Sequence, residues 1–100
     1  MREPEVFSAL ACVKRLEILE LLKDPKGHFA PQRGGDLVKD GVCVIDIAEK
    51  IDVAQPTATS HLQTLARAGF LTSKRVGQWT FYKRDETAIR ALKREIRNEL

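Results

Sequence analysis

The sequence predicts a mainly α-helical domain with one small antiparallel β-hairpin, in the chain order α-α-α-α-β-β-α. Apolar residues recur at helical spacing near both ends of the chain. A proline-led segment that stops at a glycine predicts a helix in between. Two runs rich in β-branched and aromatic residues, separated by two residues, predict the hairpin. At 100 residues, we expect one domain over 1–100, with a modest core that pairing with a second copy would enlarge.

The first two predicted helices supply core residues. In the first, over about 4–11, Val6 and Leu10 form a short apolar stripe. In the second, leucines and an isoleucine at helical spacing line one broad face of "VKRLEILELLK". We therefore expect both helices to pack on the centre of the domain.

An irregular loop follows over residues 24–41. It holds two prolines and four glycines and has no sustained periodicity. A loop of this length is unusual in so small a domain and is often functional. We expect Phe29 and Leu37 to order part of it, and we consider it a candidate for specificity.

Two helices joined by a tight turn are predicted over about 44–68. In the first of them, Ile45, Ala48 and Ile51 alternate with charged residues as in a two-turn amphipathic helix. Asp52 follows where the helix must stop. Aspartate is one of the few residues other than glycine that tolerate the left-handed backbone conformation, so we expect it to end the helix.

The second helix of the pair begins near Gln55. Pro56 lies in its first turn, where the missing N–H costs nothing, and Gly69 supplies its C-terminal stop. Ala54 precedes the helix and has no side chain that can cap it, a loss of about 1 kcal/mol that Asp52 is a candidate to offset. Its apolar stripe consists of Ala58, Leu62, Leu65 and Ala66.

The hairpin is predicted over about 71–83. Its strands, 71–76 and 79–83, are joined by Gly77 and Gln78. Glycine in the first position of a two-residue loop favours a type II′ turn.

A last helix is predicted over about 85–99, with Asp85 as its N-cap. Ile89, Leu92 and Ile96 recur at spacings of three and four residues, and charged residues occupy the other faces. A narrow apolar seam of this kind suits packing against a second helix, either in a second copy of the chain or in the chain's own core.

Charge is distributed unevenly along the chain. The net charge is only +3, but residues 53–84 contain no Asp or Glu. A surface free of carboxylates is typical of one that meets a polyanion, because acidic groups repel phosphates. The basic residues of this stretch are Arg67, Lys74, Arg75, Lys83 and Arg84.

Two helices joined by three or four residues have the spacing of a helix-turn-helix, and a basic hairpin directly after them forms a wing. In that geometry the second helix enters the DNA major groove. Glutamine pairs with adenine, threonine contacts thymine, and basic side chains attract phosphates. The candidate DNA-binding residues are Gln55, Thr57, Ala58, Thr59, Ser60, His61, Gln63, Arg67, Lys74, Arg75, Gln78 and Lys83.

The segments "QPTATSHLQTL", "AGFL" and "GQWTFY" closely resemble the winged helix-turn-helix of the ArsR/SmtB family of bacterial transcriptional repressors. The resemblance extends more loosely through "FSALACVKRLEILELL" and covers most of the chain outside 24–41. The sequence departs from the family at Ala54, where serine is common, and in its longer loop.

The resemblance implies a homodimer built through the first and last helices. It implies binding to an inverted repeat in a promoter, with one reading helix for each half-site, and repression that an inducer releases. The candidate interface residues are Val6, Leu10, Ile89, Leu92 and Ile96.

The sensor of such a repressor is not determined by this sequence. "GVCVIDIA" resembles the family's metal-sensing helix, with Cys43 and Asp46 in place, but Ile45 replaces the second cysteine. One thiolate and one carboxylate make a poor site for a soft metal, and Cys12 is a candidate to complete a pair. Three roles stay open for Cys43: a metal ligand, a target of thiol oxidation or alkylation, and a buried structural residue.

Other classes of function are less well matched. No cofactor is required by the residues present, although a metal or thiol-reactive inducer stays open. No motif pairs a nucleophile with a histidine, which argues against an enzyme. A winged-helix module that binds an acidic protein is the alternative to a repressor. The charged N-terminus and the lack of a long apolar run predict a cytoplasmic protein with no membrane partner.

Overall fold

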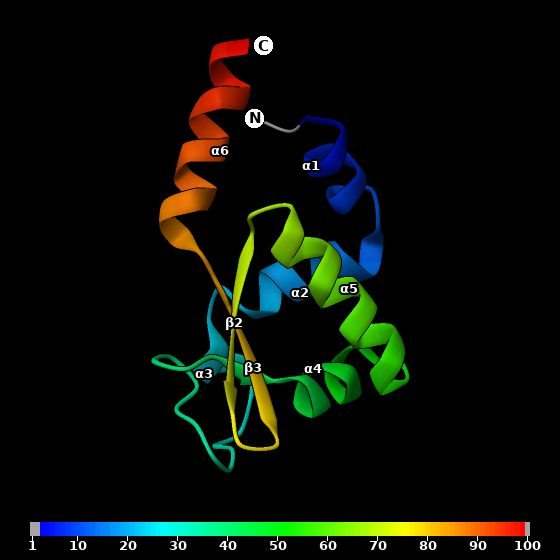
Figure 1. The fold of residues 1–100 in the computed structure, drawn as a ribbon, viewed down its shortest axis with the longest axis vertical. Helices are drawn as coiled ribbons and strands as arrows, with labels where there is room; N and C mark the ends of the chain where they lie inside the picture. The colour runs from blue at the N-terminus through cyan, green and yellow to red at the C-terminus, as the bar shows by residue number, and fades with distance from the viewer. Residues whose placement is uncertain (1–2, 100) are drawn as a thin grey trace.

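The computed structural model describes residues 3–99 and confirms a mainly α-helical fold with a small antiparallel sheet. Two short elements inside and after the predicted loop, α3 and β1, were not expected from the sequence. The elements in chain order are α1 (Glu3–Leu10), α2 (Val13–Leu21), α3 (Pro25–His28), β1 (Val42–Cys43), α4 (Val44–Ile51), α5 (Gln55–Arg67), β2 (Leu71–Val76), β3 (Trp79–Arg84) and α6 (Glu86–Glu99) (Figure 1).

The molecule is elongated, about 42 Å by 25 Å by 24 Å. Figure 1 shows α1 and α6 at one end, while the turn between β2 and β3 lies at the opposite end. The helices α2, α4 and α5 lie between these ends, beside the sheet. The two helices that the sequence predicts for dimerisation therefore lie far from the hairpin turn.

The sheet has the strand order β1-β3-β2, and both pairings are antiparallel. Val76 pairs with Trp79, so the connecting loop has the two predicted residues. Gly77 has φ of 59°, and Gln78 does not share this positive φ. A positive φ at the first central residue alone is the pattern of a type II′ turn, which confirms the prediction.

The helix ends around the central pair follow the predicted chemistry. Asp52, with φ of 59° and ψ of 54°, ends α4 in the left-handed conformation. After α5, Gly69 has φ of 94°, and the Phe70 N–H donates to the Leu65 carbonyl at 3.0 Å, a Schellman-type end. Ala54 precedes α5 without a side-chain cap. Each stop depends on a residue that the sequence had identified.

The final helix starts as predicted. The Asp85 side chain accepts a hydrogen bond from the Ala88 N–H at 2.9 Å, so Asp85 is the N-cap of α6.

The core lies where α2, α4, α5 and the sheet meet. Ile18, Ile47 and Leu62 are fully buried there. Val6 and Ile89 join this core, with exposed fractions of 2% and 5%. Their prediction as interface residues is therefore wrong for this chain, because their side chains already pack within it.

The loop over 24–41 covers one side of the hairpin. Leu37 is buried in the core and Phe29 packs against it, as expected. The Gln32 side chain accepts from the Cys43 N–H at 2.9 Å and donates to the Gly41 carbonyl at 2.5 Å. Gln32 thus continues the hydrogen bonding of the sheet beyond β1.

Glycines of this loop lie very close to β3. A Cβ at Gly34 would lie 2.7 Å from the Trp79 ring, and one at Gly35 would lie 2.8 Å from the Phe81 ring. Only a residue without a side chain fits at this distance from an aromatic ring. The loop is irregular, but its position on the hairpin is fixed by these contacts.

Candidate DNA-binding surface

The helix α5 buries one face in the core, and its other faces are partly or fully exposed to solvent. Ala58, Leu62 and Leu65 are each 0% exposed and pack into the core. The prediction that Ala58 contacts DNA is therefore wrong, because its methyl group points away from solvent. At 3.6 residues per turn, the remaining positions divide into two flanks and an outward edge.

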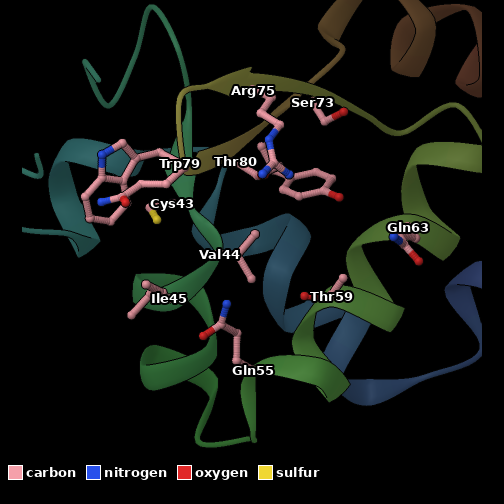
Figure 2. A pocket seen from close by; sticks show the side chains of 12 residues that line it. Cys43, Val44, Ile45, Gln55, Thr59, Gln63, Ser73, Arg75, Trp79 and Thr80 are labelled. Carbon is pink, nitrogen blue, oxygen red and sulfur yellow. The ribbon is translucent and has the colours of Figure 1, made fainter. Parts of the chain in front are cut away.

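One flank of α5 faces the hairpin across an open cleft. Gln55, Thr59 and Gln63, spaced by four residues, line the cleft from the helix. Arg75 and Gln78 line it from the hairpin. The cleft has a volume of about 590 Å³, and Figure 2 shows Gln55, Thr59 and Gln63 along one wall with Arg75 above them. We call this side of the helix the wing-side flank.

The other flank of α5 faces α2. Here the His61 Nδ1 lies 3.1 Å from the Arg15 Nη1. Burial, and then the positive charges of Arg15 and Lys14, lower the pKa of His61 below its ordinary value of 6.5. The exposed Thr57 lies one turn before His61. We call this side the α2-side flank.

Two further candidates lie on the outward edge between the flanks. Ser60 and Arg67 are both exposed and lie about two turns apart on α5. They have the accessibility that a contact with DNA needs.

The basic residues of the hairpin lie on two different faces. Directly opposite residues of an antiparallel pair share a face, and Arg75 is opposite Thr80, whereas Lys74 is opposite Phe81 and Thr72 is opposite Lys83. Arg75 and Thr80 line the cleft with α5. Lys74 and Lys83 point to the face that the 24–41 loop covers. The sequence had treated these basic residues as one set, and the strand alternation separates them.

The loop occupies both lysines of that face. Lys74 Nζ lies 2.6 Å from the Asp40 carboxylate, and Lys83 Nζ donates to the Lys39 carbonyl at 2.9 Å. The hydrogen bond from Lys74 lowers the pKa of Asp40, which stays ionised. DNA must compete with these contacts to engage either lysine.

Arg84 belongs to the fold and not to this surface. It donates to the Leu19 carbonyl at 3.1 Å and lies 2.8 Å from the Glu86 carboxylate. Its side chain is 9% exposed, so it does not supply the phosphate attraction that its position in the acid-free stretch suggested.

The candidate sensor residues Cys43 and Cys12 do not lie within a group of metal-ligating side chains in the described part of the chain. Cys43 is buried, with an exposed fraction of 5%, and ends β1, while Cys12 is half-buried before α2. Burial, and then Glu49, raise the pKa of Asp46. Within residues 3–99, no three His, Cys, Asp or Glu side chains are grouped so as to hold a metal ion.

Sequence reasoning missed two residues on α2. Lys14 Nζ donates to the Ile51 carbonyl at 2.5 Å, at the end of α4, and Arg15 contacts His61. Both residues are half-buried on α2, a helix for which the sequence predicted only core packing. Consecutive basic residues at the start of a core helix were the available signal.

The helix pair, the hairpin after it and the polar cleft between them define the winged helix-turn-helix class of DNA-binding domains. No family model matches the sequence. The chain is 45% identical over 100 residues to the uncharacterized HTH-type transcriptional regulator YbzH of Bacillus subtilis, and the match covers all of both chains. It is 31% identical over 84 residues to the transcriptional repressor SdpR of the same organism, covering 84% of this chain and 77% of SdpR.

A solved structure agrees with these relatives. The homodimeric winged helix-turn-helix DNA-binding domain of Mb0332 from Mycobacterium bovis, described as a possible ArsR-family regulator, superposes with a TM-score of 0.64 at 28% identity. The match covers 96% of this chain and 78% of that one. The chain belongs to the ArsR family of winged helix-turn-helix transcriptional regulators.

These relatives support a DNA-binding repressor and not the alternative of a protein-interaction module. Among the described helices, none is long and apolar enough to cross a membrane.

Proposed function

We propose that this repressor acts as a dimer on an inverted repeat in a promoter, with one α5 helix in the major groove of each half-site. The hairpins then lie near the flanking minor grooves, and the bound dimer excludes RNA polymerase. An inducer that lowers the affinity for DNA releases the promoter.

The wing-side flank is the observation that carries this proposal. Gln55 and Thr59 present an amide and a hydroxyl at the open side of the cleft, and both types of group read base edges. Arg75 adds a positive charge on the opposite wall. With no carboxylate in residues 53–84, nothing on α5 or the hairpin repels a phosphate.

The dimer interface is proposed at the end of the molecule formed by α1 and α6 (Figure 1). Leu10, Leu92 and Ile96 are only partly buried there, and Phe7 is 49% exposed. A second copy that covers these apolar side chains would enlarge the modest core of a chain of this length. Phe7 replaces Val6 as the proposed contact from α1.

We propose that Cys43 is a structural residue and does not sense the inducer, because its side chain is buried where β1 ends and α4 begins. The alternatives are that Cys43 binds a metal inducer or that an inducer oxidises or alkylates its thiol, and the Cys43→Ser variant tests both. Cys43→Ser is expected to leave DNA binding intact. If the variant no longer responds to a metal or oxidant that releases the wild type, Cys43 is the sensor and the structural role is wrong.

The main experiment selects bound DNA from a genomic library and then compares the selected fragment with random duplex DNA in gel shifts. We expect the selected DNA to contain an inverted repeat and to bind far more tightly than random DNA at the same salt concentration. Equal binding of both DNAs would overturn the proposal. Repeating the selection with metals and oxidants searches for the inducer.

A further inference from the structure

The guanidinium of one residue on α2 contacts both α1 and α5. Arg15, on α2, donates from Nε to the Ala9 carbonyl at 2.6 Å and from Nη2 to the Ser8 carbonyl at 3.0 Å. These carbonyls lie in the last turn of α1, where carbonyls lack donors from a following helical turn. The Ser8 carbonyl also accepts from the Ala11 N–H at 3.3 Å. The third nitrogen, Nη1, lies 3.1 Å from His61 Nδ1. The end of α1 and the reading helix are therefore held by the same side chain.

This contact determines where the proton of His61 lies. Arginine has donors only, so Nδ1 of His61 must be the acceptor and carries no proton. A neutral imidazole with an unprotonated Nδ1 has its proton on Nε2. Burial and the charges of Arg15 and Lys14 lower the pKa of His61, which favours this neutral form.

The position of His61 on α5 indicates what the Nε2–H meets. His61 lies on the α2-side flank, away from the cleft that Gln55 lines. A helix in the major groove has the two sugar-phosphate walls along its flanks and base edges at its centre. Arg15 and Lys14 add positive charge beside this flank.

We propose that Arg15 is a positioning residue for DNA recognition: it holds His61 as the Nε2–H tautomer, and this N–H donates to a DNA phosphate on the α2-side flank. The inference rests on the proposed function, since it places α5 in the major groove. It adds a backbone contact on the side of α5 opposite the wing.

The first test reads the tautomer in the DNA-free protein by ¹⁵N NMR of the His61 ring. At pH 7 we expect Nε2 at the chemical shift of a protonated nitrogen and Nδ1 at that of an unprotonated one. Arg15→Gln should mix the two tautomers, because its amide can either donate or accept, whereas Arg90→Gln, on α6, should not change the spectrum of His61. An Nδ1–H tautomer or a charged ring in the wild type would overturn the proposal, even if the Arg15 variant fails to fold.

The second test compares two substitutions of His61 on DNA. The amide nitrogen of glutamine reaches approximately the position of Nε2, and that of asparagine the position of Nδ1. His61→Asn should weaken binding roughly tenfold, as expected for one hydrogen bond to a charged group. His61→Gln should stay within about threefold of the wild type, because it keeps the donor.

The loss in His61→Asn should be the same on the selected operator and on random duplex DNA, because a phosphate is present in both. A loss confined to the operator would indicate a base contact and overturn the phosphate assignment, as would equal losses in the asparagine and glutamine variants. The two proposals fail differently. If the wild-type protein binds the selected operator no more tightly than random duplex DNA, the proposed repressor function is overturned. The tautomer measurement is made without DNA and tests the role of Arg15 separately.

Discussion

The two flanks of α5 carry similar polar side chains but differ in how these are held. On the wing-side flank, no hydrogen bond within residues 3–99 fixes the side chains of Gln55, Thr59 or Gln63, which border an open cleft. On the α2-side flank, His61 is already oriented by Arg15. Free donors and acceptors can adapt to a base sequence, whereas a fixed donor suits the regular positions of phosphates.

The hairpin repeats this difference on its two faces. Arg75 borders the cleft and donates from Nε to the neutral Gly77 carbonyl at 3.2 Å, while Lys74 is bound by the charged Asp40 carboxylate of the loop. Residues of one charge and one strand therefore differ in their availability to DNA. Four predictions test this difference between side chains that border the open cleft and side chains that are bound by other parts of the chain.

The largest effect is expected from a substitution that disturbs the hairpin, which faces the wing-side flank of α5 across the cleft. Gly41 has φ of 109°, and a Cβ there would lie 2.5 Å from the Tyr82 carbonyl oxygen on β3. We expect Gly41→Ala to lower the free energy of unfolding by about 3 kcal/mol, measured in urea, because it combines backbone strain with a backbone clash. Operator affinity should fall while the His61 ring spectrum in the remaining folded protein is unchanged.

Gly77→Ala is the matched control for this substitution. Gly77 also has a positive φ, 59°, but nothing lies within 4 Å of an added Cβ. It should cost only about 1–2 kcal/mol, the strain without the clash. Equal costs at both glycines would show that the contact of Gly41 with β3 is unimportant.

The next effect tests base reading on the wing-side flank. Gln55→Ala should cost about 1–3 kcal/mol of binding free energy on the operator and little on random DNA, because a bidentate base contact is lost. Competition binding against single-base operator variants measures the relaxed preference. A uniform loss on all DNAs would contradict the assignment.

A smaller effect separates the faces of the hairpin. Arg75→Gln should reduce the slope of log affinity against log salt by about 0.9, the value for one phosphate contact. Lys74→Gln should change it less, because Lys74 is 2.6 Å from Asp40. Fluorescence anisotropy over a salt series measures both slopes. Equal changes would mean that the ion pair with Asp40 opens when DNA binds.

The smallest effect concerns pH and the α2-side flank. The pKa of His61 is lowered in the folded state, so the unfolded state binds a proton first as the pH falls below 6.5. The free energy of unfolding should therefore decrease from pH 6.5 down to the folded pKa and then level off. This slope should be reduced in His61→Gln, as measured by urea unfolding at several pH values. A slope that the substitution leaves unchanged would assign the pH dependence to other groups.

Much of the fold follows from local chemistry that the sequence displays. Asp52 and Gly69 end the two central helices, Gly77 starts the turn, and Asp85 caps α6, each as its side chain or lack of one predicts. These features depend on neighbouring residues, so the sequence contains the information they need. The strand β1 was not predictable in this way, because two residues become a strand only by pairing with β3.

The sequence by itself determined the helices and strands other than α3 and β1, the start of α5 at Gln55, and the absence of carboxylates over residues 53–84. Only the tertiary structure decided which of the candidate DNA-binding residues are exposed and not engaged by other parts of the chain. Ala58 is buried, Lys74 is paired across 34 residues and His61 across 46. Such pairings are set by packing between distant segments, and neither periodicity nor charge along the chain encodes which segments meet.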